Sequence, residues 1–182
     1  MKLSDCKICE QLGKDHVPPT GPMTAELMII GQSPGRTEVK EGKPFVGPCG
    51  EYIDYLLDEL LLDRSDVYIT NTLKCHPPKN RPGKPEEIRN CKKTWLRHEL
   101  RAIKPKVILL LGRDAYEAVM PRNLKTKYPF SHGLVVRKKH QAIVVSYHPS
   151  YFLRQGNLLG FLEIAIPLSQ LLEGGEHGSQ EA

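Results

Sequence analysis

Two patterns of apolar positions alternate along the chain. Runs of apolar and β-branched residues predict buried strands at residues 25–31, 66–71, 106–112 and 142–149. Apolar residues at helical spacing, or a proline-and-acid start with a basic end, predict helices at 49–62, 85–103, 113–120 and 159–173, the last interrupted near Pro167. Residues 133–139 are predicted to form a hairpin arm that precedes the last strand.

This order of elements indicates the fold class. Nearly continuous apolar strands that alternate with helices are typical of an α/β fold, with a mainly parallel sheet covered on both faces. The chain has no internal repeat and no long linker, so we predict one domain over residues 1–175 and a disordered acidic tail at 176–182. Ligands of such sheets bind beyond the carboxyl ends of the strands, which indicates the segments GQSPG at 31–35, TNTLK at 70–74 and YHPSY at 147–151.

Composition adds an expected location. The chain has 182 residues, of which 40% are hydrophobic and 26% charged, as is ordinary for a soluble globular protein. It contains no apolar run long enough to span a membrane, and its first residues lack the apolar segment of a signal peptide. We therefore expect a cytoplasmic protein with no membrane association, in a compartment where thiols stay reduced.

Basic residues concentrate in one part of the chain. The formal net charge of +5 is by itself weak evidence for a polyanionic partner. The distribution is more informative, because seven basic residues crowd into one segment: Lys74, Lys79, Arg81, Lys84, Arg89, Lys92 and Lys93. A local basic patch predicts contact with phosphate groups, although a solvated charged surface would show the same pattern.

The cysteines form two pairs. Cys6 and Cys9 make a close C-x-x-C pair, and Cys75 and Cys91 bracket a proline-rich loop. Four thiolates in this arrangement suit either a tetrahedral zinc ion or an iron–sulfur cluster, and their spacing does not separate the two. Cys49 has no partner in the pattern and is interpreted as a small buried residue.

Four motifs in this order resemble a known family. They are GQSPG, GKPFVGPCG, VYITNTLKCHPPKNRPGKPEEIRNC and YHPSYFLR. Together with the cysteine spacing they are similar to the family 4 uracil-DNA glycosylases, the iron–sulfur branch of the uracil-DNA glycosylase superfamily. The resemblance runs from Cys6 to about Leu162 and implies a three-layer α/β/α sandwich. It also implies a 4Fe–4S cluster held by Cys6, Cys9, Cys75 and Cys91, with zinc as the alternative.

The same resemblance implies an activity. The enzyme would flip uracil out of DNA, hydrolyse its N-glycosidic bond, release free uracil and leave an abasic site. Its partner would be uracil-containing DNA, single- or double-stranded, and a monomer is the simplest expectation. Two alternatives are a non-catalytic or slow uracil-DNA-binding module on the same fold, and a zinc-stabilised nucleic-acid-binding protein of another kind.

Individual residues match the family's base pocket. Phe45 matches the aromatic side chain that stacks on the base, and Asn71 matches the amide that meets uracil N3–H and O4. His148 matches the histidine that meets uracil O2 as charge develops there. Gly31, Gln32 and Ser33 belong to the segment that lines the pocket. Without the resemblance, a core phenylalanine, a turn-capping asparagine and a structural histidine would be ordinary interpretations.

Further residues are expected to contact the DNA backbone. Lys79, Arg81 and Lys84 lie in the loop between the second pair of cysteines and would face phosphates. The segment 151–154 (Tyr151, Phe152, Leu153 and Arg154) offers apolar groups that could fill the space left by a flipped base, with Arg154 as a phosphate contact.

The segment 31–35 departs from the family pattern. The usual GEAPG followed by an acidic pair is replaced here by GQSPG, with Gln32 for Glu and Ser33 for Ala. Glu38 retains one later acid, but Val39 stands in place of the next. A glutamine can orient water but cannot remove its proton. We therefore expect Gln32 to act by orientation, and Glu38 to be the remaining catalytic acid.

Overall fold

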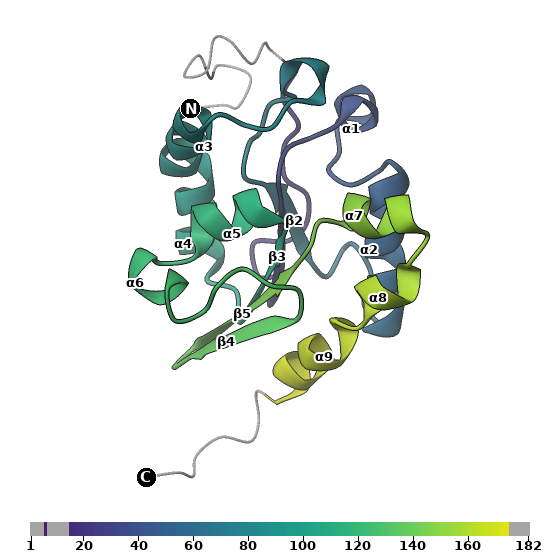
Figure 1. The fold of residues 1–182 in the computed structure, drawn as a ribbon, viewed down its shortest axis with the longest axis vertical. Helices are drawn as coiled ribbons and strands as arrows, with labels where there is room; N and C mark the ends of the chain where they lie inside the picture. The colour runs from purple at the N-terminus through teal and green to yellow at the C-terminus, as the bar shows by residue number, and fades with distance from the viewer. Residues whose placement is uncertain (1–5, 7–14, 175–182) are drawn as a thin grey trace.

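The computed structural model describes Cys6 and residues 15–174. Its centre is one five-stranded sheet with the strand order β2-β1-β3-β5-β4 (Figure 1). The strands are β1 (Leu27–Gly31), β2 (Tyr68–Asn71), β3 (Val107–Leu111), β4 (Leu134–Lys138) and β5 (Gln141–Ser146). The first three and β5 run parallel, and β4 pairs with β5 as an antiparallel edge strand. The predicted strands and the hairpin arm are thus confirmed.

Burial on both faces explains why these strands read as continuous apolar runs. Every residue of β1 and β3 is buried. Successive side chains of a strand point to opposite faces, so Leu27 and Ile29 join one core while Met28 and Ile30 join the other. The sheet therefore lies between two hydrophobic layers.

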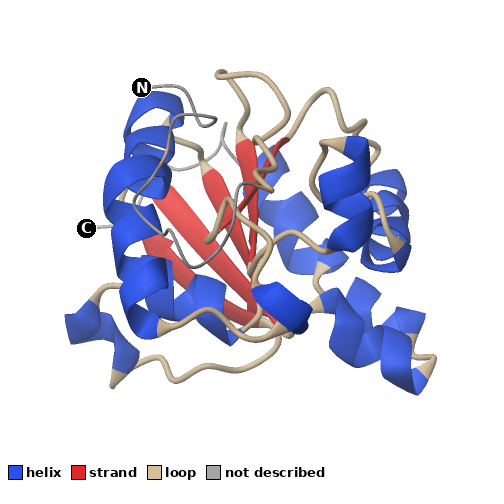
Figure 2. Cartoon of the chain, turned by 90° about the horizontal axis from the view of Figure 1, so that it is seen from above, coloured by secondary structure: helices blue, strands red, loops and turns tan. Residues whose placement is uncertain are grey.

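Helices form the two outer layers (Figures 1 and 2). One side carries α2 (Pro48–Glu59), α7 (Pro149–Gln155), α8 (Leu158–Leu162) and α9 (Ala165–Glu173). The other carries α3 (Pro85–Cys91), a π-helical turn η4 (Lys92–Leu96), α4 (Arg97–Ile103), α5 (Arg113–Val119) and α6 (Arg122–Lys125). Two short elements, α1 (Arg36–Glu41) and the 3₁₀ turn η3 (Pro78–Asn80), lie in loops. The three-layer α/β/α sandwich is confirmed.

Three predicted segments differ in detail. The helix predicted at 85–103 contains the π turn η4. The C-terminal helix is interrupted between α8 and α9, before Pro167, which lies in the first turn of α9, where the missing N–H of proline is tolerated. Residues 149–155, for which no helix was predicted, form α7, because Pro149 starts the helix and His148 caps it by accepting a hydrogen bond from the Ser150 N–H.

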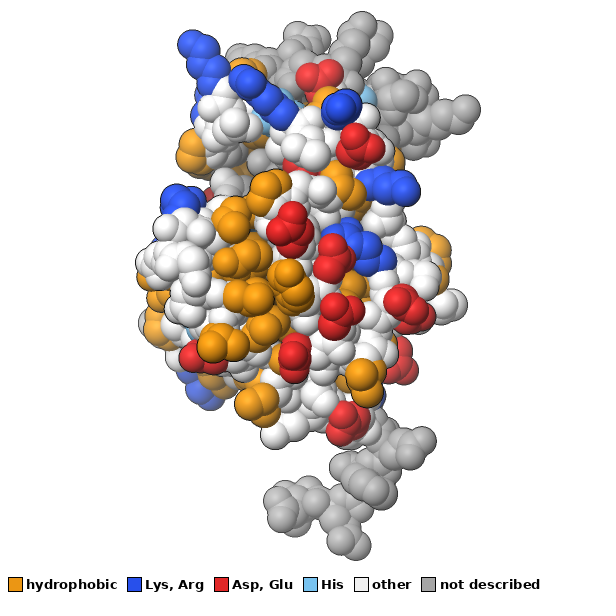
Figure 3. Space-filling view, turned by 90° about the vertical axis from the view of Figure 1, so that its right-hand side faces the viewer, with side chains coloured by type: hydrophobic (Ala, Val, Ile, Leu, Met, Phe, Trp, Pro, Cys, Tyr) orange, Lys and Arg blue, Asp and Glu red, His pale blue; other side chains and the backbone are white. Residues whose placement is uncertain are grey.

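The outer face of α2, α8 and α9 is apolar and acidic. Figure 3 shows apolar side chains gathered there beside Asp and Glu, with Lys and Arg mostly toward the end at which α1 lies. In the part of the chain that the structure describes, no helix is long and apolar enough to cross a membrane. The predicted tail at 176–182 lies outside the described residues.

Candidate base-binding site and cysteine loop

The segments after β1, β2 and β5 meet at one edge of the sheet, as predicted from the parallel topology. Hydrogen bonds join the first two, since the Thr72 N–H donates to Gly31 O and the Leu73 N–H donates to Gln32 O, both at 2.9 Å. The His76 ring adds a contact from Nδ1 to Pro34 O at 2.8 Å. The loop that enters the cysteine region is therefore tied directly to the loop after β1.

A small cavity of about 40 Å³ lies where these loops meet, and it is lined by Ser33, Glu38, Phe45, Cys49, Asn71 and His148. Five of these six were predicted site residues, and only Cys49 was not. Gly31 closes the cavity from the sheet side: a Cβ there would lie 2.4 Å from Phe45 Cζ and 2.5 Å from Asn71 Oδ1. The last position of β1 therefore requires glycine, because any side chain would occupy the space between the ring and the amide.

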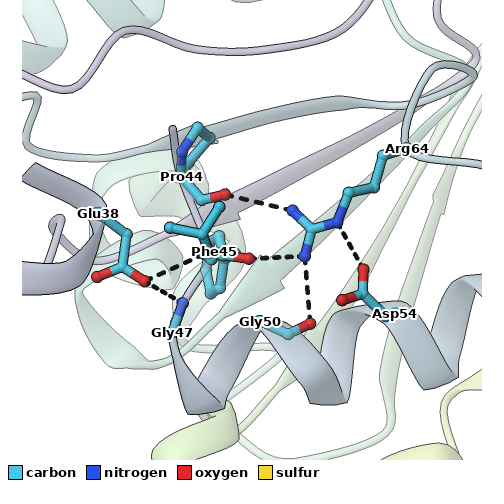
Figure 4. Close-up of polar contacts among 8 residues, drawn as sticks. Glu38, Pro44, Phe45, Gly47, Gly50, Asp54 and Arg64 are labelled. Carbon is cyan, nitrogen blue, oxygen red and sulfur yellow. Dashed lines mark hydrogen bonds and ion pairs between the residues drawn. The ribbon is translucent and has the colours of Figure 1, made fainter. Parts of the chain in front are cut away.

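The loop that carries Phe45 is held from two sides (Figure 4). Arg64 donates from Nη2 to Phe45 O at 2.6 Å and to Gly50 O at 3.3 Å, and Asp54 fixes its Nε at 2.5 Å. These bonds hold Phe45 at a φ of 53°, a left-handed conformation that non-glycine residues rarely adopt. The aromatic ring is thereby buried against the pocket.

Glu38 holds the same loop through its carboxylate. Oε2 accepts from the Gly35 N–H at 3.0 Å, and Oε1 accepts from Val46 N–H at 3.2 Å and Gly47 N–H at 2.9 Å. Both oxygens are thus engaged by backbone donors, as Figure 4 shows for the Oε1 side. This geometry suits a residue that positions Phe45 better than an acid that exchanges protons, which was the role expected for Glu38.

His148 is buried between the cavity and α7. Burial lowers the pKa of His148 to about 4, with a smaller contribution from Arg154 in the same direction and an opposing one from Glu38. Nδ1 accepts from the Ser150 N–H at 3.2 Å, which places the single proton of the neutral ring on Nε2. The histidine therefore presents an N–H donor, not a cation.

We expect a titration of His148 to show this directly. In ¹⁵N-labelled protein the ring should remain the neutral Nε2–H tautomer from pH 8 to pH 5 and protonate near pH 4. Because the folded pKa lies below the unfolded value of about 6.5, the ring's contribution to stability is complete above that pH and is lost as pH falls toward 4. An NMR midpoint near 6.5 would contradict this assignment.

A second, larger cavity of about 340 Å³ shares His148 with the first, and its lining consists of Gln32, Gly112, Arg113, Asp114, Phe130, Tyr147, His148 and Tyr151. Gln32 thus lies in this cavity and does not line the small one. The Arg113 guanidinium carbon lies 4.7 Å from the centre of the Phe130 ring. Sequence reasoning missed Arg113 and Asp114, although they directly follow a buried strand, where ligand-binding segments are expected.

Three of the four paired cysteines lie in the described chain, and each sulfur has a nitrogen close to it. Trp95 Nε1 donates to Cys6 Sγ and the Lys74 N–H to Cys91 Sγ, both at 3.4 Å, and His16 Nδ1 lies 3.0 Å from Cys75 Sγ. N–H donors stabilise thiolates and cluster sulfurs, so the surroundings fit a metal-bound set. Cys9 lies outside the described residues, and within Cys6 and 15–174 no three His, Cys, Asp or Glu form a group that could hold a metal ion.

Lys74 is buried and is not part of the basic surface patch that was predicted for the segment 74–93. The residue is 1% exposed. Nζ donates to Thr70 Oγ1 at 2.5 Å, to Asn71 O at 2.8 Å and to Glu99 Oε2 at 2.8 Å. Since its backbone N–H also reaches Cys91, this one residue joins the cysteine region to the strand end that carries Asn71.

The remaining basic residues of the loop differ in what they can contact. Arg81 binds Glu87 through two hydrogen bonds of 2.9 and 2.6 Å, and this contact lowers the pKa of the Glu87 carboxyl. Its guanidinium therefore braces the start of α3. Lys79 and Lys84 have exposed side chains.

In α7 the predicted wedge residues separate into two sets. Phe152 is 4% exposed and packs in the core, so it cannot fill a gap in DNA without unfolding. Tyr151, Leu153 and Arg154 are exposed. A helix places successive side chains on different faces, which is why the apolar segment does not act as one surface.

The architecture and the pocket together define an α/β protein with a small cavity at the carboxyl edge of its sheet, lined by an aromatic ring, an amide and an imidazole. The sequence profile of the Uracil DNA glycosylase superfamily matches residues 18–167, and the chain belongs to this superfamily.

Curated relatives agree with this assignment. The chain is 41% identical over 120 residues to the type-4 uracil-DNA glycosylase of Archaeoglobus fulgidus, covering 65% of this chain and 60% of that protein. It is 36% identical over 181 residues to the type-4 enzyme of Sulfurisphaera tokodaii, covering 89% and 77%. It is also similar to a type-5 uracil-DNA glycosylase of Pyrobaculum aerophilum, at 36% over 149 residues, covering 74% and 65%.

Proposed function

We propose that this protein is a uracil-DNA glycosylase that flips uracil out of DNA, hydrolyses the N-glycosidic bond and leaves an abasic site. The observation that carries the proposal is the cavity in which Phe45, Asn71 and His148 converge, with Gly31 leaving room between the Phe45 ring and the Asn71 amide. The relatives named as uracil-DNA glycosylases support it. The chain spans 60% of the Archaeoglobus protein, so the activity is proposed from this chain's own residues.

Recognition of uracil would depend on shape and on one amide. The Phe45 ring offers a flat apolar surface for stacking, and Asn71 can both accept from N3–H and donate to O4. The cavity is small, at about 40 Å³, so a base with an added methyl group would fit less well than uracil.

His148 would act on the leaving group. As the glycosidic bond breaks, its electron pair passes to the base and negative charge develops on uracil O2. A neutral Nε2–H donor strengthens its hydrogen bond as that charge grows, so it stabilises the transition state more than the bound substrate. Ser33 and Gly31 would shape the surrounding wall, Gln32 would line the adjoining larger cavity, and Glu38 would keep Phe45 in place.

A 4Fe–4S cluster would be held by Cys6, Cys9, Cys75 and Cys91. The donor set is four thiolates, and the nitrogens beside the three described sulfurs suit it. When bound, the cluster would supply structural cross-linking of the chain. We expect purified protein to contain iron and acid-labile sulfide in equal amounts; zinc without sulfide would contradict this and favour the alternative metal.

DNA would approach the carboxyl edge of the sheet. Lys79, Lys84 and Arg154 are exposed there or in the adjoining loops and would contact phosphates, with Arg81 contributing through the loop that it braces. Tyr151 and Leu153 are the apolar side chains able to enter the duplex. The outer face of α2 and α8 is acidic (Figure 3), so it would repel the phosphates of DNA. We propose a cytoplasmic monomer acting on uracil in single- or double-stranded DNA.

The test is release of uracil from a defined duplex. Protein is incubated with DNA that carries one labelled uracil, and alkali then cleaves any abasic site; parallel substrates carry hypoxanthine or a mismatched thymine. We expect cleavage at uracil, and a fall of about 100- to 1000-fold for His148→Ala, on the scale of losing one oxyanion donor. The His148→Ala protein also controls for contaminating glycosylase. Tight binding of uracil-DNA without cleavage at stoichiometric protein would instead identify a non-catalytic binding module.

A further inference from the structure

Asp114 lies beside the pocket and has no assigned role. It is the second residue of α5 and lines the 340 Å³ cavity together with Gln32 and His148. The Gln32 side chain acts on its carboxylate and favours the ionised form, which lowers the pKa. Oδ2 is enclosed by protein and accepts no hydrogen bond from any described residue.

A carboxylate in this state is costly to keep. Burial of an ionised oxygen without a partner destabilises the fold. Burial raises the pKa of Asp114, with Glu117 acting in the same direction and the Gln32 side chain opposing both. A purely structural acid is normally satisfied, as Glu38 and Glu87 are in this protein. Poorly satisfied acids in cavities concentrate at functional sites.

Hydrolysis needs a group that accepts a proton, and the other candidates are engaged. Both oxygens of Glu38 accept backbone hydrogen bonds. Nδ1 of His148 accepts from the Ser150 N–H, and its Nε2 carries the proton. Gln32 cannot take a proton at all. Among the described residues that line the two cavities, Asp114 is the remaining carboxylate.

We infer that Asp114, oriented by Gln32, is the catalytic general base that activates the attacking water. The inference rests on the proposed function and adds a residue to it. The water oxygen forms the bond to the sugar C1′, the electron pair of the broken C1′–N1 bond leaves with uracil, and the water proton passes to the Asp114 carboxylate. Segment 31–35 lacks a carboxylate, and α5 supplies one in Asp114. His148 lines both cavities and would lie between the water and the leaving base.

The decisive variant is Asp114→Asn, which keeps the shape of the side chain and can still accept from Gln32. Single-turnover release of uracil from duplex DNA should fall by about 100-fold or more, the usual contribution of a general base. Affinity for DNA carrying non-hydrolysable 2′-fluoro-deoxyuridine should stay within about threefold, and the melting temperature should be equal or higher because a buried charge is removed. The matched control is Asp58→Asn, the same change at an exposed carboxylate of α2.

The outcomes separate this inference from the proposed function. If the parent protein releases uracil and Asp114→Asn does so within threefold of its rate, Asp114 is not the base and the proposed function stands. If Asp114→Asn loses activity together with stability, the residue is structural and the inference fails. If the parent protein releases no uracil, the proposed function fails and the role of Asp114 fails with it.

A second variant exchanges the carboxylate and the amide between positions 114 and 32. The double change Gln32→Glu with Asp114→Asn restores one carboxylate and one amide in exchanged positions. It should recover at least about tenfold of the rate lost in Asp114→Asn, a part of the general-base contribution. Recovery would show that the two side chains act together. No recovery, with DNA affinity intact, would contradict the pairing of Gln32 with Asp114 in this step.

Discussion

Replacing Gly31 with Ala should reduce uracil release by about 100-fold or more, since displacements of about 1 Å at a reacting centre have effects of that size. The new methyl would lie 2.4 Å from the Phe45 ring and 2.5 Å from Asn71 Oδ1. Both groups must move, and they are the two that would stack on and read the base. Single-turnover release and affinity for 2′-fluoro-deoxyuridine DNA should fall together, because the pocket itself is altered.

Gly133→Ala is the control for this change. Gly133 has a φ of 74° and a Cβ there would have nothing within 4 Å, so alanine introduces backbone strain without a new steric contact. The overpacking at Gly31 and the strain at Gly133 each cost about 1–3 kcal/mol of stability. Equal losses of activity in the two variants would mean that Gly31→Ala acts through stability, against our expectation.

Lys74→Met should lower the free energy of unfolding by about 3–5 kcal/mol, the usual cost of breaking a buried ion pair by removing one partner. The change leaves the Glu99 carboxylate, whose side chain is 12% exposed, without its cation. It also removes the donor to Asn71 O and Thr70 Oγ1. Denaturant unfolding followed by circular dichroism measures the loss, and the backbone of Asn71 should become more mobile at the same time.

Two further variants test whether the loss of stability comes from the buried ion pair. Lys125→Met breaks a Lys–Glu pair whose partner Glu117 is about half exposed, and it should cost less than about 1 kcal/mol. Adding Glu99→Leu to Lys74→Met should restore most of the stability, because an apolar pair often replaces a buried ion pair without loss. If Lys74→Met costs no more than Lys125→Met, the buried pair contributes nothing beyond a surface contact.

The layout of the sheet could be predicted from the sequence because burial on both faces leaves continuous apolar runs. The run VILLL is buried at every position of β3, and the loops after such strands meet at one edge whatever their side chains. The same rule would have identified Arg113 and Asp114 after β3. The π turn at 92–96 was not predictable, because one inserted helical residue changes the apolar spacing too little to detect.

The roles of charged residues were harder to predict than their positions. Lys74 and Arg81 resemble their exposed neighbours in sequence, yet one is buried against Glu99 and the other is bound to Glu87. Their partners are 25 and 6 residues away, and such pairing depends on tertiary structure. Phe152 likewise lies between Tyr151 and Leu153 in the sequence. Only the helical conformation directs its side chain into the core and leaves the other two exposed.

The π turn also sets the rotation of α3, which carries Cys91, relative to α4, which carries Glu99. Each residue of an α-helix advances the chain by about 100° around the axis, and η4 holds one residue more than the regular repeat between Cys91 and α4. If that residue were deleted while α4 stayed on the sheet with Glu99 beside Lys74, α3 would rotate by about a quarter of a turn. Cys91 would then point away from Cys75. Length in 92–96 is therefore constrained as well as the identities of Trp95 and Leu96. A substitution at the exposed Lys93 should be tolerated where a deletion is not.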